Sequence, residues 1–149
     1  MTATLFLEMK RLEPADMPLA LALADSERGD DPDSESFGLD ASVELLKGCR
    51  AWGMWIKGAL SGAAWVMDTP DAAVVRALAI GRGWRCTGLF VWMLSELASG
   101  LRRDGAAGIR LAVAGGGYRL GEGLEEAGFV RPADGAEAFP AGTWSYRGA

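Results

Sequence analysis

The residues best suited to chemistry lie in one segment, LAIGRGWRCTGLF, at positions 78–90. An apolar run is followed there by three glycines and two arginines, and then by a helical pattern. The first amides of a helix lack intrahelical partners and point along the positive end of its dipole, which suits them to bind an anion. Glycine lets the backbone approach that anion, and arginine adds positive charge and hydrogen-bond donors for phosphate. The segment is therefore typical of a phosphate-binding loop between a strand and a helix.

Spacing excludes two common kinds of phosphate loop. A P-loop requires lysine and then Ser/Thr after its last glycine, Gly88, but Leu89 and Phe90 stand there. A dinucleotide-binding GxGxxG that begins at Gly81 fails because Cys86 replaces its third glycine, and because antiparallel strands are expected before it. The segment is neither of these two loops.

The same segment resembles the coenzyme A signature of GNAT-type N-acetyltransferases, in which an apolar strand end is followed by R/Q-x-x-G-x-G/A. The matching residues are Leu78-Ala79-Ile80, then Trp84, then Arg85-Cys86-Thr87-Gly88-Leu89-Phe90. EEAGF at positions 125–129 is similar to the helix that ends just before Gly-Phe in that family. The order of elements along most of the chain agrees, so the chain resembles a divergent member.

The resemblance implies an acyl-CoA co-substrate, in the first place acetyl-CoA. The loop would bind its pyrophosphate with Arg85, Cys86, Thr87, Gly88, Leu89 and Phe90. The pantetheine arm would lie where the central strand and the strand at 109–114 separate, paired with the backbone of Leu78, Ala79 and Ile80. A backbone N–H there would polarise the thioester for direct attack by an amine. The implied activity is N-acylation of a small amine, a protein N-terminus or a lysine.

The chain departs from the family at three positions. Phe90 replaces the last small residue of the loop, although its spacing with Leu94 places it on the apolar stripe of the helix. Leu124 stands where the family carries its tyrosine acid, and Gly117 where it often carries asparagine. These differences keep a second hypothesis open, a GNAT-like binding or regulatory domain without catalysis, and a third, an oligomeric structural module.

The proton carriers stay unassigned. Tyr146, Ser95, Tyr118 and water are weak candidates, and Tyr118 projects from a different face of its helix than Leu124. Cys86 is either a reactive thiolate at a helix start or a small loop residue, and the second interpretation is favoured.

Two further sets of residues allow a structural and a functional interpretation. The acidic residues between Asp25 and Glu35 either attract a cationic amine or form a solvated loop, which is favoured. Trp52, Trp55 and Trp65 either fill the core, which is favoured, or line an acceptor pocket or a dimer seam.

The composition and net charge exclude several classes of function. The chain has 149 residues, a net charge of −5, two cysteines and no histidine. The missing histidine excludes Ser-His-Asp and Cys-His catalysis, and the cysteine spacing predicts thiols rather than a metal site. The negative charge opposes a nucleic-acid partner, and no segment is typical of a membrane span or signal peptide. We expect a cytoplasmic protein without bound metal.

Periodicity predicts a mixed α/β fold in one domain over 1–149. Strands are expected at 5–12, 73–80, 109–114, 129–131 and 143–147, with 73–80 at the centre of the sheet because it is apolar on both faces. An antiparallel hairpin is expected from Ala51, with period-two residues up to Ile56 and, after a turn at Gly58, up to Met67. Helices are expected at 14–26, 42–47, 89–103 and 118–127, and a loop at 25–36. The result is a central sheet of six to seven strands with helices on both faces.

Overall fold

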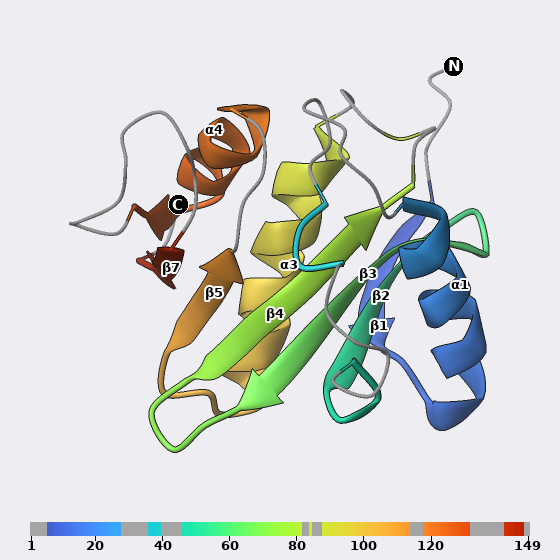
Figure 1. Cartoon of the computed structure of the whole chain (residues 1–149), viewed down its shortest axis with the longest axis horizontal. Coiled ribbons are helices and arrows are strands. Elements are labelled where there is room, and N and C mark those ends of the chain that lie inside the picture. Colours follow the sequence, from blue (N-terminus) through green and yellow to red (C-terminus); the bar gives the residue numbers. More distant parts are fainter. Residues whose placement is uncertain are drawn as a thin grey trace.

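A computed structural model describes residues 6–27, 36–39, 46–81, 84, 88–113, 118–131 and 142–147. Its strands form one seven-stranded sheet in the order β1-β2-β3-β4-β5-β7-β6 (Figure 1). The elements are β1 (Leu7–Arg11), the 3-10 turn η1 (Pro14–Asp16), α1 (Met17–Glu27), β2 (Arg50–Ile56), β3 (Ala59–Asp68), β4 (Ala73–Ile80), α3 (Leu89–Arg103), β5 (Ile109–Val113), α4 (Tyr118–Glu126), β6 (Phe129–Val130) and β7 (Gly142–Tyr146). The mixed α/β fold is confirmed, with β4 at the centre of the sheet.

Helices cover both faces of the sheet, and the period-two pattern of the strands decides which side chains each helix meets. On one face, Trp52, Met54 and Ile56 of β2 join the apolar stripes of α3 and α4 in the larger core. On the other face, Ala63 and Trp65 of β3 pack against α1. Figure 1 shows α1 on the opposite side of the sheet from α3. β4 therefore lies between the two layers and contributes residues to both cores.

Element bounds differ little from those expected. β4 and α3 have the predicted limits, whereas α1 continues to Glu27 and so includes the first three residues of the predicted loop at 25–36. Of the helix predicted at 42–47, the described residues contain only Leu46 and Lys47, which are helical. None of the described helices is long and apolar enough to cross a membrane.

β4 and β5 run parallel but pair over only three residues each. Ala73–Val75 pair with Ile109–Leu111. Beyond these residues β4 continues to Ile80 without pairing with β5, while β5 pairs on its other edge with β7 as far as Val113. A β-bulge lies where the two strands part, because Val75 pairs with Val66 and Ala77 pairs with Trp65, which leaves Arg76 as the extra residue. The separation of these two strands that the resemblance implied is therefore present.

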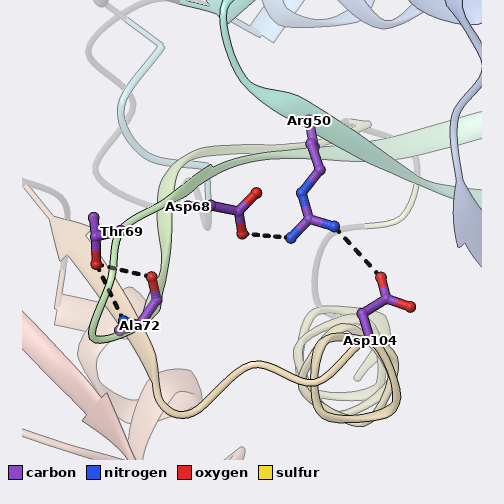
Figure 2. Close-up of polar contacts among 5 residues, drawn as sticks. All are labelled: Arg50, Asp68, Thr69, Ala72 and Asp104. Carbon is purple, nitrogen blue, oxygen red and sulfur yellow. Dashed lines mark hydrogen bonds and ion pairs between the residues drawn. The ribbon is translucent and has the colours of Figure 1, made fainter.

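The end of the sheet opposite this opening is held by polar contacts. Arg50 of β2 donates to Asp68 at the end of β3 at 2.7 Å and to Asp104 after α3 at 3.4 Å (Figure 2). Beside them, the Thr69 hydroxyl donates to the carbonyl of Ala72 at 2.9 Å and closes the turn into β4. These contacts hold the turn between β3 and β4 in place.

Candidate functional site

The candidate site is the edge of β4 that faces the opening beyond the bulge. The extra residue at the bulge reverses which amides face β5, so Leu78 and Ile80 direct their N–H groups into the opening. Ala79, between them, pairs with Ala63 of β3. Of the three residues expected to meet the pantetheine arm, two present their backbone to the opening and one presents it to the neighbouring strand.

A short segment of the chain itself occupies this edge. Phe37 N–H donates to the carbonyl of Leu78 at 2.9 Å, and Leu78 N–H donates to the carbonyl of Phe37 at 2.8 Å. Ile80 N–H donates to the Ser36 hydroxyl oxygen at 3.1 Å. We call residues 36–39 the edge segment; it is the cyan trace against β4 in Figure 1. Three of the groups that β4 directs into the opening, the Leu78 N–H and C=O and the Ile80 N–H, are thereby used.

Packing holds the edge segment closely on the bulge. Phe37 is buried in the larger core and Leu39 in the smaller one. Gly38 has φ +72°, and a side chain there would collide with the Arg76 carbonyl and come within 2.9 Å of Ala77 Cα. The sequence did not predict this contact, because residues 25–36, which end at Ser36, have the composition of a solvated loop. Phe37 and Leu39 are apolar on either side of Gly38, but three residues are too few for a period-two pattern to predict the contact.

The other end of the site is the start of α3. Gly88, its N-cap, has φ 79° and ψ −1°, and as a glycine it has no side chain to cap the helix. A Cβ at Gly88 would have nothing within 4 Å among the described residues. The backbone at the start of this fifteen-residue helix therefore has open space within the described part of the chain, and the first amides of a helix suit an anion.

Phe90 does not obstruct this position. Its side chain is only 1% exposed and lies in the larger core with Leu94 and Leu97, so only its backbone is directed to the loop. Leu89 is likewise buried. Arg82, Arg85, Cys86 and Thr87 lie outside the described residues. The predicted stripe at Phe90 is confirmed, and the edge of β4 is occupied by the edge segment in this structure.

Of the candidate proton carriers, Tyr146 lies far from the opening. Leu124 is fully buried in the core. Tyr146 packs on Phe129, with ring centroids 5.1 Å apart, and lies under the Arg102 guanidinium. Because Ser145 pairs with Arg110 and Arg110 with Val74, Tyr146 is level with the start of β4. At about 3.3 Å per residue, Leu78 is roughly 16 Å further along.

Two other candidates are placed only in part. Ser95 is half-buried, about 9 Å along α3 from Leu89 at 1.5 Å per residue. Tyr118 begins α4, and its side chain is not among those described.

The hairpin tryptophans do not line one pocket. Trp52 and Trp65 are buried on opposite faces of the sheet, and Trp55 is half-buried beneath the Lys10 ammonium, 5.2 Å from its ring. Cys49 is a buried thiol whose pKa is raised above 9.0 by burial, an effect that the positive charge of Arg76 partly offsets. Cys86 and the acidic residues at 30–33 lie outside the described residues.

The fold was compared with those of known proteins. No protein-family model and no curated protein matches the sequence. Among solved structures, the ribosomal-protein-S18-alanine N-acetyltransferase of Escherichia coli superposes with a TM-score of 0.70 at 17% identity, over 95% of this chain and 93% of that one. A GNAT family acetyltransferase from Brucella melitensis, in complex with acetyl-CoA, gives 0.58 at 16% identity over 95% and 96%.

A third similar structure is larger. N-acetylglutamate synthase from Neisseria gonorrhoeae, complexed with coenzyme A and N-acetyl-glutamate, gives a TM-score of 0.67 at 17% identity over 97% of this chain and 35% of that one. The chain has the GNAT acetyltransferase fold, as the loop and the order of elements predicted.

Proposed function

We propose that this chain, with the fold of the GNAT acetyltransferases, is an acyl-CoA dependent N-acyltransferase that uses acetyl-CoA. The observation that carries the proposal is the separation of β4 from β5 after three paired residues, together with the open space around Gly88 at the start of α3 among the described residues. Similar structures from Brucella melitensis and Neisseria gonorrhoeae contain acetyl-CoA and coenzyme A. The acceptor is an amine on a small molecule, a protein N-terminus or a lysine.

The coenzyme supplies the activated acyl group, and the residues of this chain bind and orient it. The amides at the start of α3, with Arg85, hold the pyrophosphate. The N–H of Leu78 is directed into the opening and serves as a hydrogen-bond donor there. When the amine attacks, its nitrogen forms a bond to the acyl carbon, the C–S bond of the thioester breaks, and the amine loses a proton. Leu124 has no proton to give and Tyr146 lies at the far end of β4, so we propose that water carries the proton from the amine to the departing thiolate.

Calorimetric titration with acetyl-CoA and with free coenzyme A tests the proposal. Gly88→Trp places a large side chain in the open space at the start of α3, and we expect it to weaken binding at least tenfold. Gly105→Trp is the matched control, because Gly105 also has a positive φ, of 91°, and open space, but lies beyond the other end of α3. Binding to the wild type and to Gly105→Trp, with loss in Gly88→Trp, supports the site at the loop. No binding of either ligand at millimolar concentration contradicts the proposal.

The second candidate function is a coenzyme-binding or regulatory domain that has lost catalysis. The buried Leu124 at the position of the family's tyrosine favours it. A panel of amines assayed for release of free thiol from acetyl-CoA separates the two functions. Turnover with any amine above the rate without amine supports the transferase, whereas tight binding without turnover supports the regulatory domain.

A further inference from the structure

The hydrogen bonds at the edge of β4 decide what can bind there. Each backbone N–H donates one strong hydrogen bond, and a strand edge pairs with one extended partner at a time. The Leu78 N–H and C=O and the Ile80 N–H are bonded to Phe37 and Ser36. An extended ligand with amide groups, such as a pantetheine arm, requires the same three groups.

We propose that the edge segment is a resident occupant of the coenzyme site, and that coenzyme binding displaces Phe37 and Ser36 from β4. This inference rests on the proposed function. At β4 the number of hydrogen bonds is kept, since each bond that the strand loses to the edge segment is replaced by one to the ligand, while the edge segment gives up its bonds and its buried position. The ligand therefore competes with a segment of the same chain.

The hydrogen-bonded part of this contact is short, although Phe37 and Leu39 are buried. Among the described residues, the backbone of Phe37 and the hydroxyl of Ser36 bond to β4, a much shorter pairing than the five to seven residues by which β1 and β2 pair with their neighbours. Gly38 makes it feasible, because any Cβ there would collide with the bulge at Arg76 and Ala77. If the segment occupies the edge in nine molecules of ten, the apparent affinity for the coenzyme falls about tenfold.

Variants of the edge segment test whether it competes. Gly38→Ala forces the segment off the bulge, and we expect coenzyme A to bind about tenfold more tightly than to the wild type. Gly58→Ala is its control, because Gly58 has a similar φ of 81° but nothing within 4 Å. Ser36→Ala removes the acceptor for Ile80 N–H and, as a milder change, should tighten binding about fivefold. Ser26→Ala is its control, since the Ser26 hydroxyl is exposed and bonds only locally, to the Leu23 carbonyl.

Amide hydrogen exchange, followed residue by residue by NMR with and without coenzyme A, provides the decisive readout. We expect the Phe37 and Leu78 amides to be protected in the free protein. With saturating coenzyme A, Phe37 should lose its protection while Leu78 keeps it, because only the partner of Leu78 changes.

The outcomes separate this inference from the proposed function. Coenzyme binding that leaves Phe37 protected, with equal affinities in Gly38→Ala and the wild type, overturns the displacement and leaves the acyltransferase proposal intact. Failure of coenzyme A to bind the wild type, Gly38→Ala and Ser36→Ala overturns both. Binding by Gly38→Ala or Ser36→Ala that is clearly tighter than to the wild type supports both.

Discussion

Cys49 shows how the burial of one side chain sets a pH dependence. Its thiol pKa is raised above 9.0, chiefly by burial, and Arg76 opposes the shift. The unfolded chain therefore loses this proton at a lower pH than the folded protein. The stabilising contribution of the neutral thiol is complete below pH 9 and is lost as the pH rises from about 9 through the higher pKa of the folded state.

We expect Cys49→Ala to lose less stability than the wild type between pH 8 and 10.5. The slope of the free energy of unfolding against pH should differ by up to about 1.4 kcal/mol per pH unit, the value for one proton. Urea unfolding at a series of pH values measures this difference, and Cys86 stays in both proteins, so its own titration cancels. Parallel slopes above pH 9 would show that Cys49 titrates alike in the folded and unfolded chain.

At single positions, the sequence predicted side-chain direction better than it predicted contacts. Helical spacing with Leu94 placed Phe90 on the apolar stripe, and its side chain is in the core. The bond from Phe37 to Leu78 joins residues 41 positions apart in sequence and depends on the bulge at Arg76, which reverses the edge to which Leu78 directs its amide. Neither the Phe37–Leu78 contact nor the bulge at Arg76 leaves a periodic pattern in the sequence, so neither was predicted.

Among the elements, Arg50 connects three that are distant in sequence, as Figure 2 shows: β2, the end of β3 and the end of α3. Its side chain is 23% exposed, and those of Asp68 and Asp104 are 58% and 40% exposed. Ion pairs so accessible to water contribute little each. Asp104 also lies at the C-cap of α3, where its negative charge opposes the helix dipole unless Arg50 is present.

We therefore expect Arg50→Met to lower the free energy of unfolding by about 1 kcal/mol. Asp104→Asn should cost less, because it removes the ion pair and the unfavourable dipole interaction together. Urea unfolding in low and in 1 M salt measures both effects, and the loss in Arg50→Met should shrink at high salt. Lys10→Met is the control, since Lys10 pairs with Glu8 at 3.4 Å on the exposed edge strand and should have a smaller effect. Equal effects of the Arg50 and Lys10 changes would show that the bridge between elements adds nothing.

Elements with strong periodicity were predicted to the residue, as for β4 and α3, because a strand apolar on both faces and an amphipathic helix each leave a long pattern. The end of α1 was misplaced because acidic and polar residues, which were read as a loop, occupy its last turn. A two-residue contact such as that of Ser36 and Phe37 is too short for any pattern.

For the whole molecule, the resemblance implied the separation of β4 and β5, whereas the insertion of β7 between β5 and β6 follows from long-range pairing that the sequence does not encode locally. The start of α3 at Gly88 and the edge of β4 at Leu78 meet at the same end of the sheet. A ligand that spans them would connect the central strand, the helix behind it and the edge segment. Its binding should therefore change the stability of the whole fold.

Thermal unfolding with coenzyme A tests this connection. A ligand at a hundred times its Kd stabilises the folded state by about 2.7 kcal/mol, or roughly 5–10 °C in melting temperature for a chain of this size. We expect Gly38→Ala to melt below the wild type without ligand, because it loses the packing of the edge segment. At equal coenzyme A it should rise further, since tenfold tighter binding adds about 1.4 kcal/mol. Gly58→Ala should also melt lower but rise by the same amount as the wild type. An equal rise in all three proteins would show that the edge segment and the coenzyme do not compete for β4.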